Sequence, residues 1–243
     1  MYTTNWLQIP NNAATTAAAF NEIDTLFTQK IFYHPGYMGF INWYGEVWNW
    51  GSSATPNDIY NKIDHTNNVH ELSYVLYVGH GGPQGFYAHT IYPNNEYIKP
   101  DLVSFSTIQA RNSGNSNHRL AFMWVCNGGN SITDASPKAW NNPSTSGYTW
   151  IGFSGASPWL IEEIKTNQLY KHWLVFFYYY ALSGQYSVQQ ALNQASQQVG
   201  YSNFASSPLS TGYSTYWPYN PPDNYPGQMH VLGNPSGTYL PAW

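Results

Sequence analysis

Two short segments of the chain each end a run of apolar residues with a side chain that can carry out acid–base or nucleophilic chemistry. Residues 74–79 are followed by His80, and residues 120–125 are followed by Cys126, the only cysteine in the sequence. A thiolate is a strong nucleophile, and a nearby imidazole can supply or accept the proton that attack on a carbonyl group requires. The two residue types together therefore predict acyl-transfer chemistry if the fold brings them to one place.

The elements that would position this pair are two buried strands. Both apolar runs have the length and the aromatic and β-branched residues expected of strands covered on both faces. Each ends in a glycine-containing turn, and open α/β sheets bind ligands at the carboxyl ends of their strands. If the strands are parallel neighbours, His80 and Cys126 emerge side by side. The N–H groups of Gly81 and Cys126 could then hold an oxyanion, each donor contributing about 2.7–4 kcal/mol. A single cysteine after a buried strand is also commonly an inert core residue, so it is the pairing that favours catalysis.

Further elements follow from apolar periodicity and capping residues. A helix is predicted to begin at Pro56, with Thr55 as its cap and Asp58 in its first turn, and another after Ser187, with Gln190 completing a capping box. Other helices are expected at 13–30, 102–111, 131–140 and 160–183. Further strands are expected at 37–50, 148–153 and 229–232. The remainder of 81–116 and the segment 201–228 are expected to be irregular. Strands alternating with helices predict one domain, residues 1–243, with a mostly parallel sheet covered on both faces.

Composition excludes several classes of protein. Among 243 residues, 42% are apolar and 18% aromatic, which excludes a disordered chain, whereas only 8% are charged. A net charge of −4 with eight Lys and Arg provides no basic surface for nucleic acid. The longest apolar run, 173–182, is too short to span a membrane, and one cysteine excludes an internal disulfide and a cysteine-based zinc site. We expect no metal and no cofactor.

The surface composition bears on localisation. Tyr, Asn, Ser, Thr and Gln take the place of charged residues, which is typical of secreted or cell-surface proteins. The first residues have neither a basic start nor an apolar core, so no signal peptide is recognised in this chain. We therefore expect a secreted or cell-surface protein whose signal peptide is not part of this sequence.

Taken together, His-Gly after one apolar strand and Cys after another resemble the signature of the caspase-like (clan CD) cysteine peptidases, which include caspases, legumains, gingipains, separases and clostripain. The closest likeness is to the gingipain catalytic domain, and it extends over roughly residues 5–240. Its further motifs are Thr-Pro-Asn-Asp-Ile at 55–59, Val-Cys-Asn-Gly at 125–128, Ile-Gly-Phe-Ser-Gly-Ala-Ser-Pro-Trp at 151–159, the helix in 184–195, and Val-Leu-Gly-Asn-Pro-Ser at 231–236. Asn234 departs from the usual Asp, and Val125 from the usual Ala.

The resemblance implies a three-layer caspase-like sandwich with a mostly parallel central sheet flanked by helices. It also implies a cysteine endopeptidase that acts on peptide or protein substrates through a thioester acyl-enzyme. Cys126 would attack the peptide carbonyl, His80 would protonate the leaving amine, and the amides of Gly81 and Cys126 would hold the oxyanion. No charged residue lies beside Cys126 in the sequence, which leaves the charge preference of the substrate pocket open.

The resemblance also suggests where a substrate side chain binds. Glu46 lies near the position at which gingipains keep the acid that receives a basic P1 residue, and a buried carboxylate would bind a guanidinium strongly. The alternative is a carboxylate that faces water or orients His80. Ser154, Ser157 and Trp159 are the candidates for the wall of the substrate pocket, and Trp159 is equally explained by core packing.

Two other functions remain compatible with the sequence. With 11 Trp and 22 Tyr in a charge-poor chain, the protein could be a catalytically silent caspase-like module for binding or self-assembly on the cell surface. It could also be a thiol acyl-transfer enzyme such as a transpeptidase, in which aminolysis outcompetes hydrolysis. We assign Tyr77, Trp124 and Trp150 to the core. No metal-ligand spacing is recognised among the remaining histidines, His34, His65, His70, His89, His118, His172 and His230.

Overall fold

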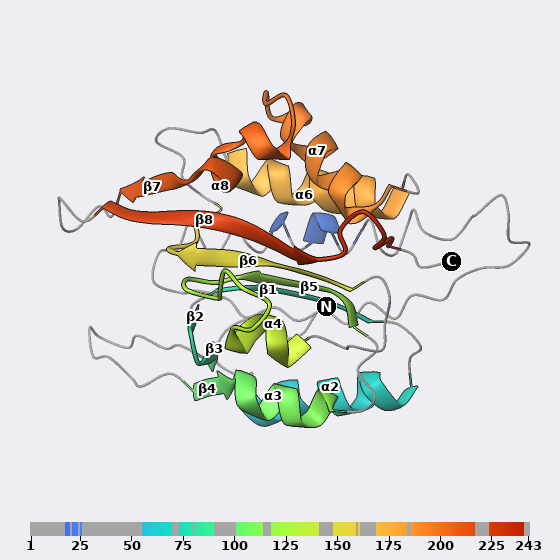
Figure 1. Cartoon of the computed structure of the whole chain (residues 1–243). Coiled ribbons are helices and arrows are strands. Elements are labelled where there is room, and N and C mark those ends of the chain that lie inside the picture. Colours follow the sequence, from blue (N-terminus) through green and yellow to red (C-terminus); the bar gives the residue numbers. More distant parts are fainter. Residues whose placement is uncertain are drawn as a thin grey trace, which may run out of the picture.

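Helices cover both faces of a central β-sheet in the computed structural model of the chain (Figure 1). The structure describes residues 18–19, 21–23, 25, 55–69, 73–79, 81–89, 101–113, 118–140, 148–158, 160, 169–183, 186–216 and 224–240. The expected strand at 37–50 and most of the expected helix at 13–30 lie outside these residues; within the latter, the described residues between 18 and 25 are helical.

The central sheet has the strand order β1-β5-β6-β8-β7. Its strands are β1 (Ser73–Val78), β5 (His118–Trp124), β6 (Thr149–Gly155), β8 (Asn224–Gly233) and β7 (Tyr213–Tyr216). β1 pairs with β5 and β5 with β6 in parallel, whereas β8 is antiparallel to both of its neighbours, β6 and β7. The prediction of a mixed α/β protein with a mostly parallel sheet is therefore confirmed.

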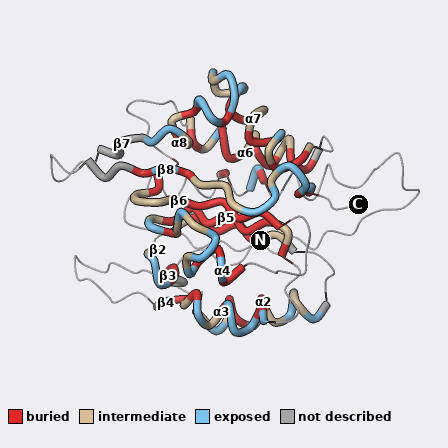
Figure 2. Tube along the Cα trace, viewed as in Figure 1, coloured by how far each residue is buried: buried red, intermediate tan, exposed pale blue. Residues whose placement is uncertain are grey.

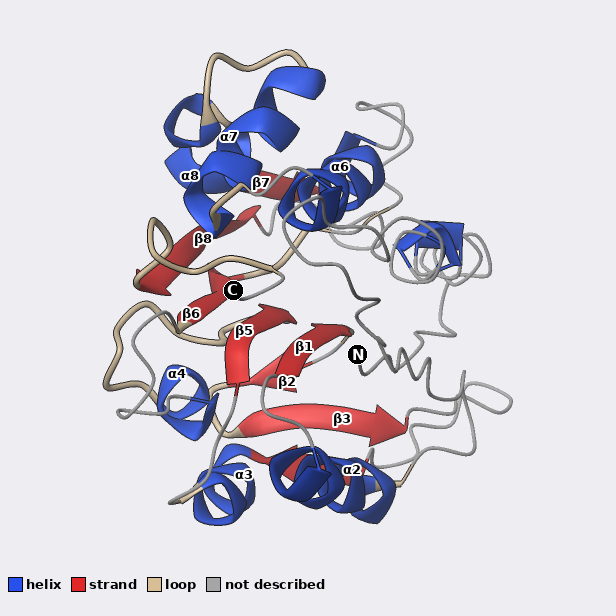
Figure 3. Ribbon diagram, turned by 90° about the vertical axis from the view of Figure 1, so that its right-hand side faces the viewer, coloured by secondary structure: helices blue, strands red, loops and turns tan. Residues whose placement is uncertain are grey.

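Each face of the sheet carries its own hydrophobic cluster. On one face lie α6 (Leu169–Ser183), α7 (Val188–Gln198) and α8 (Pro208–Thr211), and on the other α2 (Pro56–Val69), α3 (Phe105–Asn112) and α4 (Ala135–Trp140) (Figure 3). Along β5, Phe122 and Trp124 belong to the first cluster, and Ala121 and Met123 to the second. Because both faces are covered, most residues of β5 and the first five residues of β6 are buried (Figure 2). Tyr77, Trp124 and Trp150 are core residues, as predicted.

A second, smaller sheet contradicts the expectation of irregular structure after His80. β2 (Gly81–Gly82), β3 (Gly85–His89) and β4 (Asp101–Ser104) form an antiparallel sheet with the order β2-β3-β4. A Cβ atom on Gly85 would lie 2.2 Å from the carbonyl oxygen of Val103, so glycine permits this close pairing. Strands of two to five residues are too short to show a recognisable alternation, which is why the sequence did not reveal them.

The predicted helix starts are confirmed where a capping residue marks them. The Asp58 carboxylate accepts hydrogen bonds from the N–H and hydroxyl of Thr55, and the Ser187 and Gln190 side chains form the predicted capping box of α7. The helices expected from 102 and 131 begin later, at Phe105 and Ala135.

The C-terminal third differs more from expectation. Helix α6 is described from Leu169, Leu160 lies in a turn, and residues 161–168 are outside the described part. The described residues of 201–228 are not irregular as expected, because they contain a 3₁₀ turn η1 (Phe204–Ser206), α8, β7 and the first half of β8. None of the helices in the described ranges is both long and apolar enough to cross a membrane.

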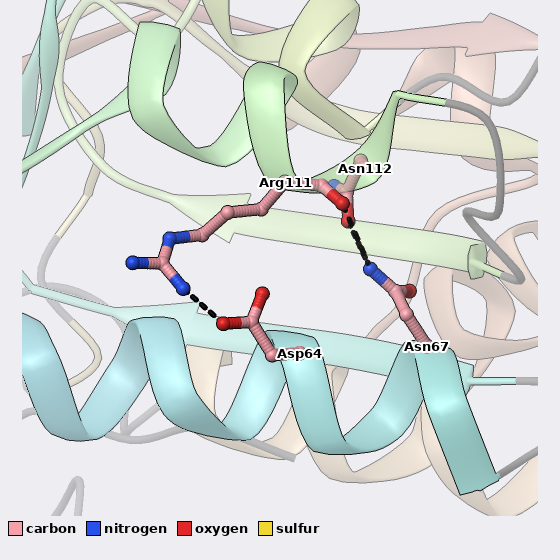
Figure 4. A network of polar contacts seen from close by, with 4 residues as sticks. All are labelled: Asp64, Asn67, Arg111 and Asn112. Carbon is pink, nitrogen blue, oxygen red and sulfur yellow. Dashed lines mark hydrogen bonds and ion pairs between the residues drawn. The ribbon is translucent and has the colours of Figure 1, made fainter.

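A polar network ties helices α2 and α3 together at the end of the sheet where β5 begins (Figure 4). Asp64 of α2 forms an ion pair with Arg111 of α3, and the Asn67 Nδ2 group donates to Asn112 Oδ1 at 2.8 Å. Asn112 also donates to the carbonyl oxygen of Ala139 in α4 at 2.8 Å and accepts from the fully buried His118 ring at 3.3 Å. This network lies at the opposite end of β5 from Cys126.

Substituting Gly152 by alanine should destabilise the protein by about 1–3 kcal/mol through overpacking. A Cβ atom there would lie 2.4 Å from the Trp150 indole, which is fully buried and donates from Nε1 to the Ser136 hydroxyl at 3.1 Å. The ring cannot move aside without giving up that contact. Urea unfolding measures the loss, with Gly82→Ala as the matched control because its Cβ position is open. Equal stability of both variants would contradict this packing.

Candidate functional site

The carboxyl ends of β1 and β5 lie side by side. The parallel register pairs Val78 with Trp124, and the N–H group of Gly79 donates to the Trp124 carbonyl oxygen at 3.1 Å. The chain therefore leaves both strands at the same edge of the sheet, as the sequence predicted for the segments before His80 and Cys126. His80 itself lies outside the described residues, so the position of its ring remains a prediction.

Gly81 extends this contact beyond the strand end. A Cβ atom on Gly81 would lie 2.9 Å from the Cβ atom of Val125 and 3.1 Å from the carbonyl oxygen of Gly85. The residue after His80 is thus in direct contact with the residue before Cys126, and only glycine fits without displacement of either neighbour. This places the Gly81 backbone close to Cys126, while its proposed role as an oxyanion donor remains a prediction.

Cys126 lies in a turn held against the end of β6. The turn is fixed by the Asn127 N–H, which donates to the Gly155 carbonyl at 2.7 Å, and by the Gly129 N–H, which donates to the Phe153 carbonyl at 3.2 Å. Asn127 has φ of 52°, a left-handed conformation that asparagine tolerates better than most residues. Cys126 carries a free thiol, and the residue is half-buried.

Ser157 is the direct partner of the Cys126 sulfur. Its backbone N–H donates to Sγ at 3.4 Å, and its hydroxyl oxygen lies 3.7 Å from Sγ. The Pro158 carbonyl, which follows, accepts a hydrogen bond from Trp124 Nε1 at 2.6 Å. Trp124 is buried just before Cys126, and it thereby fixes the segment that carries Ser157.

Ser154 has a different partner on the neighbouring strand. Its hydroxyl oxygen lies 2.7 Å from Nε2 of His230 in β8, and 3.5 Å from the Gln228 carbonyl oxygen. Partial burial lowers the pKa of His230, and the negative charge of Asp134 opposes that shift. Asp134 is itself held by the N–H groups of Asn130 and Ser131, at 2.7 and 3.0 Å from Oδ2.

The predicted site residues are therefore only partly brought together by the described structure. Gly81, Cys126 and Ser157 lie at one edge of the sheet, and Ser154 lies beside them on β6. Glu46 and Trp159 lie outside the described residues, so their roles in substrate binding remain predictions. Sequence reasoning missed His230 because it looked for metal-ligand spacing, whereas the β6–β8 register pairs His230 with Gly152 and so places it diagonally from Ser154.

Within the described ranges, no group of three or more His, Cys, Asp and Glu side chains is arranged to hold a metal ion. No known family model matches the chain, and the search of curated proteins finds no match.

Proposed function

We propose that the protein is a caspase-like cysteine endopeptidase that cleaves peptide bonds through a thioester formed on Cys126. The observation that carries this proposal is the parallel pairing of β1 and β5. It puts the two residues that flank His80 in sequence, Gly79 and Gly81, against Trp124 and Val125, which lead to Cys126. The only thiol thus emerges where the histidine segment also leaves the sheet.

The motifs that suggested the family also meet in space. The Gly-Asn-Pro-Ser segment at the end of β8 contacts the start of α7, where the Gln189 N–H donates to the Pro235 carbonyl at 3.0 Å. The Asn234 N–H donates to the Tyr148 carbonyl at 2.8 Å, directly before β6. Three segments of the resemblance, around 151–159, 184–195 and 231–236, therefore support one another in the fold, which favours a caspase-like arrangement of the layers.

In the proposed reaction, the Cys126 sulfur attacks the carbonyl carbon of the scissile peptide bond. The N–H groups of Gly81 and Cys126 hold the negative charge that develops on the carbonyl oxygen. His80 gives a proton to the leaving amine, and the C–N bond breaks to leave a thioester. Water then attacks the thioester and regenerates the thiol. The N–H of Ser157, which donates to the Cys126 sulfur, holds the sulfur in position for the attack.

The substrate is proposed to be a peptide or protein, with a basic P1 residue received by Glu46 and with Ser154, Ser157 and Trp159 forming the pocket wall. The low charge content supports a secreted or cell-surface location. The alternative, a silent binding module, was suggested by the abundance of aromatic residues. Most of the aromatic side chains that the structure describes are buried in the two clusters, so the described surface adds no support for it.

A peptidyl acyloxymethyl ketone with arginine at P1 should label Cys126 of the wild-type protein covalently and in a saturable manner. The peptide part occupies the substrate cleft, and the sulfur displaces the acyloxy group. Mass spectrometry of the digested protein locates the adduct, and a fluorogenic peptide with the same P1 residue measures hydrolysis. A matched ketone with aspartate at P1 tests the preference for a basic side chain.

The same experiment separates the alternatives. Iodoacetamide, which needs no peptide cleft, is the control for accessibility of the thiol. Alkylation by iodoacetamide without labelling by either ketone and without hydrolysis would overturn the peptidase proposal. Aminolysis products that exceed hydrolysis products when a peptide amine is added would favour the transpeptidase instead.

A further inference from the structure

Beyond the cysteine, the described structure contains a hydroxyl and an imidazole in direct hydrogen-bond contact. Ser154 Oγ and His230 Nε2 are 2.7 Å apart and come from adjacent antiparallel strands, β6 and β8. Both side chains are half-buried, so the pair is neither sealed in the core nor fully solvated. A distance of this size between a serine oxygen and a histidine nitrogen lies within the range at which histidine serves as general base.

The local backbone places the serine near the carboxyl end of its strand. Ser154 is followed by Gly155, which ends β6 with φ of 72° in the left-handed region. The Gly155 carbonyl accepts a hydrogen bond from the Asn127 N–H. Ser154 and Gly155 pair with Gln228 and Gly227 of β8, so the serine lies in the last two residues of β6, at the end of the strand from which Cys126 also emerges on β5.

The electrostatic surroundings suit a base that must become charged during reaction. Burial lowers the pKa of the imidazole, which favours the neutral form, the form in which a ring nitrogen can accept a proton. The negative charge of Asp134, in the loop before α4, raises the pKa of the ring and so favours the imidazolium form once the proton has been transferred. The Asp134 side chain is fixed by two backbone N–H groups of its own loop, so this charge has a defined position.

We propose that Ser154 and His230 form a second nucleophile–base pair, independent of Cys126, that reacts with activated esters and organophosphonates. The Ser154 oxygen attacks the carbonyl carbon or the phosphorus atom, and its proton passes to His230 Nε2. The leaving alkoxide or fluoride departs, and the imidazolium gives the proton to the alkoxide or, for the fluoride, to solvent. With an ester, water attacks the acyl-serine, and the product is a carboxylic acid with the serine restored. With a fluorophosphonate, the phosphonyl-serine is stable and can be detected.

The experiment exposes the folded wild-type chain and its Cys126→Ala variant to a fluorophosphonate probe and maps the adduct by mass spectrometry. We expect the label on Ser154 in both proteins. His230→Gln keeps a hydrogen-bond acceptor beside the serine but removes the base, and it should slow labelling about a hundredfold. Ser202→Ala is the matched serine control, because Ser202 is exposed and its hydroxyl contacts Ser206 rather than an imidazole. This control should label at the wild-type rate.

The outcomes are distinct from those that test the peptidase. Labelling at Ser154 that persists in Cys126→Ala supports the pair whether or not the thiol proves catalytic. The proposal is overturned if intact wild-type protein carries no adduct at Ser154, or if His230→Gln labels as fast as wild type. Because the mapping uses the unmodified chain, failure of a variant to fold does not remove the test. A further assay measures hydrolysis of a nitrophenyl ester. Hydrolysis by Cys126→Ala that is absent in the double variant Cys126→Ala/Ser154→Ala would show that the pair catalyses turnover as well as reacting with the probe.

Discussion

Replacement of Cys126 by alanine should reduce peptide hydrolysis by a factor of about 10⁴ or more. The thiol is the group that forms the covalent intermediate in the proposed mechanism, and nothing else at that position can replace it. Its half-buried location also makes the substitution mild for the fold, because the residues before it, Trp124 and Val125, carry the core packing. The measurement is the rate of cleavage of the best fluorogenic peptide by purified wild type and variant.

The matched control for this substitution is Ser157→Ala. It removes the hydroxyl 3.7 Å from the sulfur but keeps the backbone N–H that donates to it at 3.4 Å. We expect a loss of about tenfold or less from this variant, since the shorter of the two contacts remains. Circular dichroism and urea unfolding verify that both variants are folded. Undiminished hydrolysis by Cys126→Ala would contradict a peptidase centred on this residue.

The sequence predicted those parts of the fold that a pattern within a few consecutive residues is enough to recognise. β1, β5 and β6 each contain an apolar run, and burial on both faces explains why these runs show no polar alternation. The starts of α2 and α7 carry reciprocal side-chain and backbone hydrogen bonds within four residues, so the capping pattern is legible without the rest of the structure. From these local patterns we predicted parallel central strands, and hence the edge of the sheet at which the segments before His80 and Cys126 end.

The parts that could not be predicted depend on partners distant in sequence. β2, β3 and β4 are short, and two of them begin with glycine, so their pairing depends on close backbone approach rather than on a side-chain pattern. β8 extends over Asn224–Gly233 because β6 and β7 supply partners on both sides, whereas its first half contains proline and glycine. Tertiary pairing here overrides low strand propensity.

In the candidate site, too, some features were predictable from local sequence and others depend on distant partners. The segments that carry Gly81 and Cys126 were predictable because each follows a recognisable strand. The contact between Ser157 and Cys126 depends on a turn after β6, and the contact between Ser154 and His230 depends on the register between β6 and β8. Register is fixed by the whole sheet, so sequence spacing alone contained no signal for either contact.

Acid should destabilise the folded protein through His118, and replacing this residue with glutamine should remove much of that effect. His118 is fully buried at the start of β5, and burial lowers its pKa from 6.5 to about 3. Above pH 6.5, the residue is neutral in both folded and unfolded chains and contributes no pH dependence. Between pH 6.5 and about 3, the unfolded chain binds a proton that the folded chain does not. Stability therefore falls by about 1.4 kcal/mol for each pH unit of acidification in this window.

Urea unfolding of wild type and His118→Gln at pH 7, 6, 5 and 4 measures this contribution. The drop in unfolding free energy from pH 7 to pH 4 should be smaller in His118→Gln by about 3 kcal/mol, because glutamine does not titrate. His172→Gln is the matched control, because it makes the same substitution at an exposed position of α6. The glutamine variant also loses the ring that contacts Asn112 and Trp140, which lowers its stability equally at every pH. The prediction is therefore tested by the slope of the unfolding free energy against pH. An identical slope in wild type and His118→Gln would show that protonation of the buried imidazole does not cause the loss of stability in acid.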